Sequence, residues 1–380
     1  MQSDATIPFN KPAIVGREMY YIAQSVLNQH TSGDGPFTRQ CRDFIERQFS
    51  ANRALLTTSC TTALELSAML LDIKHGDEVI LPSYTFVSTA NAFVLRGARP
   101  VFVDVRPDTL NIDEKLLPAA ISPRTRAICV VHYAGVSCEM SRICEFAEKH
   151  SLAVVEDAAQ AVNSRYKGQY LGTIGQLGTY SFHETKNFIC GEGGALLVND
   201  ESLLERADVL REKGTDRSRF FRGLTDKYTW VDIGTSALPS DLLAAYLYAQ
   251  LEARDLITAK RKQIYDNYEA GLSSLFEIGH LLKPHIPENC DSNYHMYFVR
   301  TRDLETRSNL ISFLRQRGIH AVFHYVPLHS SPMGKEYGYT QGQLPVTENM
   351  SERVLRLPCY FDLTDREQER VVEVIHSFFG

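Results

Sequence analysis

The sequence predicts an α/β fold, with a large domain built on a mostly parallel central sheet and a smaller C-terminal α+β domain. Between about residues 50 and 200, short β-branched runs alternate with helical stretches, as in helices that cover a sheet. Several runs are continuously apolar, which is typical of strands buried on both faces. A long helical pattern at Ser240–Tyr268 leads into a mixed segment. We therefore expect a large domain with an N-terminal arm at 1–250 and a small domain at 251–380.

The elements follow in order along the chain. Strands of the large domain are expected at Glu78–Leu81, Pro100–Val105, Ala127–His132, Ala153–Glu156, Thr179–Phe182 and Ala195–Val198. Helices are expected between them at Thr61–Asp72, Thr85–Arg96 and Met140–His150. The small domain should contain strands at Met296–Arg300 and Ala321–Phe323 and helices at Ser308–Arg317 and Asp365–Phe379. Ligands of such sheets bind beyond the carboxyl ends of the strands, so residues that follow a strand are the candidates for function.

The composition excludes several classes of function. The 380 residues carry a formal net charge of −6 without a basic block, which disfavours nucleic-acid binding. The eight cysteines are scattered without a C-x-x-C pair, which argues against a zinc site and for reduced thiols in a cytosol. The sequence shows neither a secretory signal nor an apolar run of the ~20 residues that span a bilayer. We expect a soluble cytoplasmic protein with no metal, nucleic-acid or membrane partner.

The first candidate for chemistry is TTSCTTALELSAML at Thr57–Leu70. The small residues Ser59, Cys60 and Thr61 stand directly before an amphipathic helix. A helix start offers unpaired backbone N–H groups and the positive end of the dipole, which together suit a phosphate. A plain N-cap by Ser59 or Thr61 explains the same pattern.

The second candidate is VVEDAAQ, in which Asp157 follows a predicted strand and Gln160 lies just beyond. A carboxylate at the end of a buried strand needs a positive partner, because an isolated buried charge is costly. A protonated pyridine nitrogen would be such a partner. A helix cap or a structural salt bridge is the alternative.

The third candidate is GTYSFHETKNFICGEGGALLVND, which contains Ser181, His183 and Lys186. A lysine beyond a strand end and against an apolar wall can lose its proton and attack an aldehyde. The glycines at 191, 193 and 194 would let the chain turn tightly past a ligand. The alternative is a solvated loop lysine beside a turn.

These three segments together predict a pyridoxal 5'-phosphate site. They supply, in chain order, contacts for the phosphate, the pyridine nitrogen and the aldehyde of that cofactor. Phe86, after another strand, could stack on the cofactor ring, although it could equally be a core aromatic residue.

With these residues the chain resembles the DegT-type sugar-nucleotide aminotransferases, within the fold-type-I pyridoxal-phosphate enzymes. The most specific segments are TSCTTALEL, DEVILPSYTFVSTANA, VEDAAQ and SFHETKNF with GEGGAL, and the similarity continues to HYVPLH at His324–His329. The resemblance implies that Lys186 is the Schiff-base lysine, Asp157 the partner of the pyridine nitrogen and Gln160 a contact of the ring hydroxyl. Phosphate and stacking contacts are implied for Cys60, Thr61, Ser181 and Phe86.

One segment departs from the family pattern. Many relatives have a glycine-tyrosine-asparagine-tyrosine-arginine segment that reaches into the neighbouring subunit of a dimer, and here it reads Gly234–Leu238. Ser236 would then replace the asparagine that contacts phosphate. Leu238 replaces the arginine, so the anchor of the donor carboxylate is open. Arg219 and Arg222 are candidate substitutes, with a solvated basic loop as the alternative.

The resemblance also implies a reaction. RGLTDKYTWVDIG is most similar to family members that aminate C4 of dTDP-4-dehydro-6-deoxy-D-glucose with L-glutamate, through a pyridoxamine 5'-phosphate stage. Their product, dTDP-4-amino-4,6-dideoxy-D-galactose, serves surface polysaccharides such as enterobacterial common antigen or O-antigen. His183, His324 and His329 could contact the sugar or diphosphate, or could be structural. Transamination at C3, a pyridoxamine-dependent sugar dehydratase and a non-catalytic cofactor-binding regulator remain as alternatives.

Overall fold

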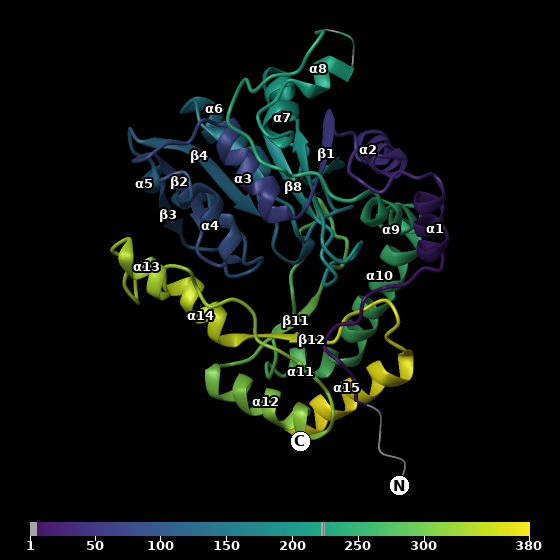
Figure 1. Ribbon diagram of the computed structural model, residues 1–380. Helices are drawn as coiled ribbons and strands as arrows, with labels where there is room; N and C mark the ends of the chain where they lie inside the picture. The colour runs from purple at the N-terminus through teal and green to yellow at the C-terminus, as the bar shows by residue number, and fades with distance from the viewer. Residues whose placement is uncertain (1–5, 222, 224) are drawn as a thin grey trace.

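A seven-stranded sheet forms the centre of the molecule (Figure 1). The computed structural model describes residues 6–221, 223 and 225–380. The strand order is β1-β9-β8-β5-β4-β2-β3, and β9 runs antiparallel to the other six strands, which all run the same way. The strands are β1 Arg53–Thr57, β2 Glu78–Pro82, β3 Arg99–Val103, β4 Thr125–Val131, β5 Ala153–Asp157, β8 Leu177–Ser181 and β9 Gly194–Val198. The predicted α/β fold with a mostly parallel sheet is confirmed.

Helices cover both faces of this sheet. One face packs on α2 (Pro36–Gln48), α6 (Met140–Lys149) and α9 (Asp241–Glu252), and the other on α3 (Cys60–Leu70), α4 (Val87–Val94) and α7 (Leu204–Arg211). Successive strand residues alternate between the two cores: Val154 packs on the first face and Val155 on the second. The apolar runs in the sequence follow from this two-sided burial.

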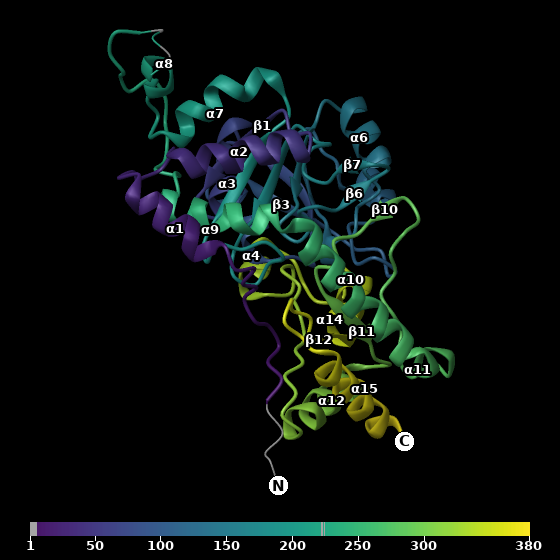
Figure 2. The ribbon, with the colours of Figure 1, turned by 90° about the vertical axis from the view of Figure 1, so that its right-hand side faces the viewer.

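The chain after α9 forms a second, smaller core (Figure 2). Helix α10 (Arg254–Gly271) leads away from the sheet to a two-stranded pair, β11 (Tyr297–Arg300) and β12 (Val354–Leu357). Around that pair lie α11 (Ser273–Glu277), α12 (Leu304–Gln316) and α15 (Asp365–Phe379). Ile7 is buried in the same core and pairs with Ile319, so the start of the N-terminal arm packs with the C-terminal region rather than with the large sheet.

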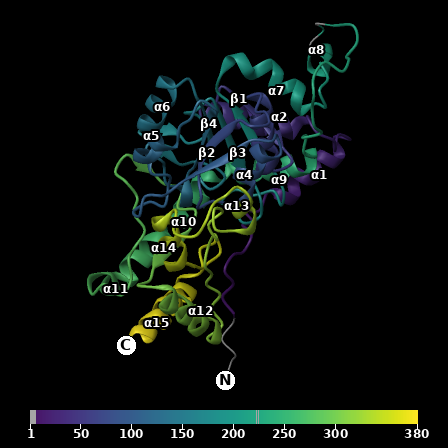
Figure 3. The same cartoon turned by 90° about the vertical axis from the view of Figure 1, so that its left-hand side faces the viewer.

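The remaining elements lie around these cores (Figure 3). The remaining helices of eight or more residues are α1 (Glu18–Leu27) and α14 (Pro345–Arg353), while α5 (Leu117–Ala120), α8 (Arg217–Phe221) and α13 (Pro332–Glu336) are shorter. Three two-residue strands, β6 (Arg165–Tyr166), β7 (Gln169–Tyr170) and β10 (Cys290–Asp291), form a separate small sheet. In the part of the chain that the structure describes, no helix has the length and apolar character needed to cross a bilayer.

Three details differ from the sequence expectation. Strand β1 was not expected, because its five residues run directly into the candidate phosphate segment. The long helix is two helices, because the backbone at Ala253 leaves the helical conformation between α9 and α10. The expected strand at Ala321–Phe323 is reduced to one bridge between Val322 and Arg356.

The directions of the strands position the functional residues. Strands β1, β5 and β8 run the same way, so their carboxyl ends meet at one edge of the sheet. Thr57, Asp157 and Ser181 are the last residues of these three strands. Thr57 and Asp157, which are 100 positions apart, are therefore brought to one edge together with Ser181, as expected for ligand sites in open α/β sheets.

Candidate active site

A cavity of about 380 Å³ lies between that edge of the sheet and the C-terminal region. Ten of the fourteen residues singled out in the sequence line it: Ser59, Cys60, Thr61, Phe86, Asp157, Gln160, Ser181, His183, Lys186 and His324. The structure thus brings together the three segments that the cofactor hypothesis requires.

The amino end of α3 forms one side of the cavity. Ser59 caps this helix, since its hydroxyl accepts a hydrogen bond from the Thr62 amide at 3.1 Å. The Thr61 hydroxyl lies 2.8 Å from that of Ser88, at the start of α4. A Cβ on Gly194 would lie 2.4 Å from the Cys60 nitrogen, so the close approach of β9 to this helix end requires glycine. Ser59 therefore acts as the N-cap, and this cap is compatible with phosphate binding at the same helix end.

The two adjacent carboxylates of VVED face in opposite directions. Glu156 is fully buried, accepts hydrogen bonds from the amides at 172, 174 and 175 and lies 2.9 Å from His132 Nε2. Asp157 faces the cavity and accepts from the Thr89 hydroxyl at 2.7 Å and the Ala159 amide at 3.2 Å. Alternation along β5 therefore makes Glu156 structural and leaves Asp157 available to a ligand.

Lys186 lies on the cavity wall in the turn between β8 and β9. Its backbone N–H donates to the His183 carbonyl at 2.9 Å, and Gly191 in the same turn has φ +85°. Burial, together with the positive charge of Arg356, lowers the pKa of the Lys186 amine. A larger fraction of the amine is therefore neutral and can act as a nucleophile or base.

An aromatic and amide cluster lies beside Asp157. Gln160 accepts from the Ala134 amide at 2.6 Å and donates to the Tyr325 hydroxyl at 2.9 Å. The Phe86 ring is 57% exposed and lies 6.4 Å from the Tyr325 ring. Phe86 is thus a cavity-facing ring and not a core aromatic residue, which makes stacking on a planar ligand feasible.

The three histidines occupy different environments. His183 lies on the cavity wall, with Nδ1 2.9 Å from the Thr185 hydroxyl. His324 also lines the cavity, and burial, with Arg356 and Lys186 nearby, holds its pKa well below the ordinary value. His329 is fully buried outside the cavity, with Nδ1 2.7 Å from the Ser83 hydroxyl and Nε2 2.8 Å from Glu348. The expected substrate contact of His329 is corrected accordingly, because both ring nitrogens are already bound within the protein.

Ser236, the expected phosphate contact in a neighbouring subunit, and Arg219, a candidate anchor of the donor carboxylate, lie away from this cavity. Arg219 is exposed on α8, which projects from the sheet, and pairs with Glu205 at 2.8 Å. Arg222 lies outside the described residues. Ser236 is exposed and, with Leu238, lines a separate cavity of about 760 Å³. Neither Arg219 nor Ser236 reaches the Lys186 cavity of its own chain.

The structure adds four residues that the sequence did not single out. Arg261, His295, Tyr325 and Arg356 come from the C-terminal region and line the cavity. Tyr325 belongs to the HYVPLH segment, whose resemblance to the family could have indicated this residue. Arg261 and Arg356 stand in an ordinary helix and strand, so only the packing of the two regions reveals them.

Comparisons with known proteins decide the family. The model of the DegT/DnrJ/EryC1/StrS aminotransferase family matches residues 13–376. The chain belongs to this family. It is 33% identical to the spore coat polysaccharide biosynthesis protein SpsC of Bacillus subtilis, over 98% of this chain and 96% of SpsC. The crystal structure of the aminotransferase TlmJ from Streptoalloteichus hindustanus matches with 32% identity, a TM-score of 0.90 and 99% of each chain covered.

The family is dependent on pyridoxal phosphate, and this chain is a sugar aminotransferase that uses that cofactor. Spr1654 from Streptococcus pneumoniae, named as a sugar aminotransferase, has been solved in a pyridoxal-phosphate and a pyridoxamine-phosphate form. These match with 27% and 28% identity, TM-scores of 0.90 and 0.91 and 98% of each chain covered. The residues present fit the cofactor, because a helix end, a buried carboxylate and a lysine with a lowered pKa surround one cavity.

Proposed function

We propose that this enzyme transfers the amino group of L-glutamate to C4 of dTDP-4-dehydro-6-deoxy-D-glucose, giving dTDP-4-amino-4,6-dideoxy-D-galactose for surface polysaccharide synthesis. The observation that carries the transaminase chemistry is the single cavity shared by Lys186, Asp157 and the amino end of α3. The choice of sugar is supported by the RGLTDKYTWVDIG segment. The similarity to SpsC, which is named for polysaccharide biosynthesis, supports the proposed pathway.

The cofactor contacts follow from the cavity. We assign the phosphate to the backbone N–H groups and small side chains at the α3 start, with Ser181 opposite them. Asp157 would hold a proton on the pyridine nitrogen, because a buried carboxylate favours a cationic partner. The Gln160 amide nitrogen has a second N–H beyond the one given to Tyr325, and we assign it to the ring hydroxyl.

Lys186 would carry the protons of both half-reactions. Pyridoxal phosphate supplies an aldehyde that accepts the amino group and a ring that withdraws electrons. The Lys186 amine removes the proton from the donor's α-carbon, and in the return half-reaction it delivers a proton to sugar C4. Burial lowers the pKa of Lys186, which favours the neutral amine required for the first step. His183 and His324 face the same cavity and are assigned to the sugar or diphosphate.

Amination of defined keto-sugar nucleotides tests this assignment. The enzyme loaded with cofactor would be incubated with L-glutamate and a panel of 3-keto and 4-keto sugar nucleotides, with Lys186→Ala as the blank. We expect an amino group at C4 with the galactose configuration, identified by mass spectrometry and NMR. Amination at C3 would show that the enzyme is a C3 transaminase. Loss of a hydroxyl without amination would indicate a dehydratase. Cofactor binding without conversion of any sugar would indicate a regulator.

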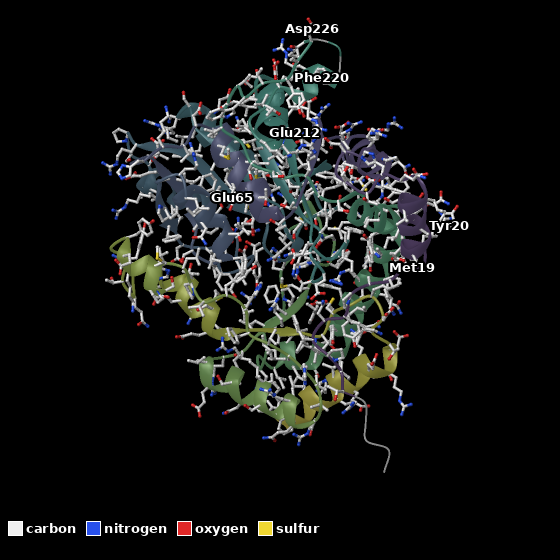
Figure 4. All side chains as sticks on the ribbon, viewed as in Figure 1. Met19, Tyr20, Glu65, Glu212, Phe220 and Asp226 are labelled. Atoms are coloured by element: carbon white, nitrogen blue, oxygen red, sulfur yellow. The ribbon has the colours of Figure 1, made fainter. Side chains whose placement is uncertain are left out.

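We also propose that the active enzyme is a homodimer. Met19 and Tyr20 project from α1 on the outer side of the molecule (Figure 4), and both are largely exposed. Trp230 is 80% exposed beside the segment that contains Ser236. The neighbouring exposed side chains of Met19 and Tyr20 support an interface on α1, because contiguous exposed apolar surface marks interaction sites.

Light scattering tests the dimer directly. We expect a mass of twice the chain mass of 42.9 kDa at micromolar concentration. Tyr20→Glu would place a charge in the interface and shift the mass toward that of one chain. A single-chain mass for the active wild-type enzyme at every concentration would refute the dimer.

A further inference from the structure

Arg356 reaches the cavity from the C-terminal region. It belongs to β12, and its guanidinium lies 4.6 Å from the centre of the Phe9 ring. One Nη donates to the Phe323 carbonyl over a long 3.4 Å, and Nε is buried without a hydrogen-bond partner. Among the described residues no carboxylate lies within 4.0 Å of this guanidinium. Arg356 is therefore a partly buried cation with unused donors.

The charges around the cavity do not neutralise Arg356. The cationic side chains on its wall are Lys186, Arg261 and Arg356, and the carboxylates are Asp157 and Glu192. Asp157 already accepts two hydrogen bonds, and Glu192 is 69% exposed and lies beside His183. A partly buried cation without a counter-charge favours a negatively charged partner, so this site is suited to an anionic ligand.

Arg261 is less suited to bind an anionic ligand. Its two Nη atoms donate to the carbonyls of Cys359 and His295 at 3.2 and 2.8 Å. These bonds direct the guanidinium fork toward the backbone, and Nε is buried without a hydrogen-bond partner. Of the two arginines, Arg356 is the one whose guanidinium fork can donate to both oxygens of a carboxylate.

We infer that Arg356 binds the carboxylate of the amino donor, an inference that rests on the proposed function. The donor's α-carboxylate is attached to the carbon that Lys186 deprotonates, so its anchor must lie in the Lys186 cavity. Arg356 meets this condition, whereas Arg219 lies on α8, outside the cavity. The diphosphate of a sugar nucleotide is separated from the reacting carbon by the sugar ring and requires a more distant contact. Arg356 thereby provides, within one chain, the cation that Leu238 cannot supply.

The half-reaction with the amino donor alone tests whether Arg356 binds the donor carboxylate. The pyridoxal-phosphate form of Arg356→Gln would be mixed with L-glutamate, and the loss of its visible absorbance followed over a range of concentrations. We expect the glutamate concentration for half-maximal rate to rise about 100-fold, because a charge-assisted bidentate pair is lost. Arg356→Lys keeps the charge without the fork and should show an intermediate rise. Propylamine, an amine without a carboxylate, should react with the variant and the wild type at rates within about threefold of each other.

Two controls separate this role from general damage. Arg300→Gln removes another partly buried arginine with an unpartnered Nε, on the paired strand β11 but outside the cavity, and should leave the glutamate dependence unchanged. The pyridoxamine-phosphate form of Arg356→Gln should react with the keto-sugar nucleotide as the wild type does. Unchanged glutamate dependence would overturn the inference, as would a defect confined to the sugar-nucleotide step. A wild-type enzyme that does not react with glutamate at all would instead refute the proposed function.

Discussion

Lys186→Ala is expected to reduce turnover by about 10⁴-fold or more, because it removes the side chain that we propose as both the covalent attachment point and the proton carrier. The visible absorbance that depends on the lysine-bound cofactor should disappear at the same time. The measurement is a spectrum after cofactor addition, combined with an end-point assay of the amino sugar. The α3 start and Asp157 remain in the variant, so non-covalent cofactor binding should persist.

An exposed lysine provides the matched control. Lys149→Ala, in the last turn of α6, removes a lysine of the same intrinsic chemistry far from the cavity and should keep the wild-type spectrum and rate. A Lys186→Ala enzyme that aminates the sugar at the wild-type rate would exclude Lys186 from catalysis.

Asp157→Asn should slow turnover by about 10³-fold and weaken cofactor retention, because the neutral amide no longer favours a protonated pyridine nitrogen. The side chain keeps its size and can still hydrogen-bond Thr89, so the local geometry should survive. Cofactor retention is measured by dialysis and absorbance, and the slowed step by single-turnover reaction with L-glutamate.

The adjacent carboxylate gives a control for Asp157. Glu156→Gln loses hydrogen bonds on the other face of β5, and should lower the free energy of unfolding while the holoenzyme spectrum stays unchanged. If Asp157→Asn behaved in the same way, with normal single-turnover rates, Asp157 would be a structural residue.

The local sequence was sufficient to predict where residues at the ends of strands lie. Asp157 and Ser181 end parallel neighbours, so the period of the apolar runs already places them at one edge. The histidines of HYVPLH show the limit of such reasoning. His324 faces the cavity while His329, five positions later, is buried against Ser83 and Glu348. Their difference depends on how an irregular segment packs, and no periodicity describes that.

The sequence alone determined the α/β class and the cofactor and was enough to predict the role of Lys186, because strand periodicity and short motifs are local properties of the chain. The same lysine acquires its lowered pKa only after folding, when burial and Arg356 surround it. Arg356 itself is 170 positions away in the numbering, on strand β12 between two residues of the smaller core. Which cation reaches the cavity is therefore decided by the packing of the C-terminal region on the sheet edge, since long-range contacts leave no signature in the neighbouring residues.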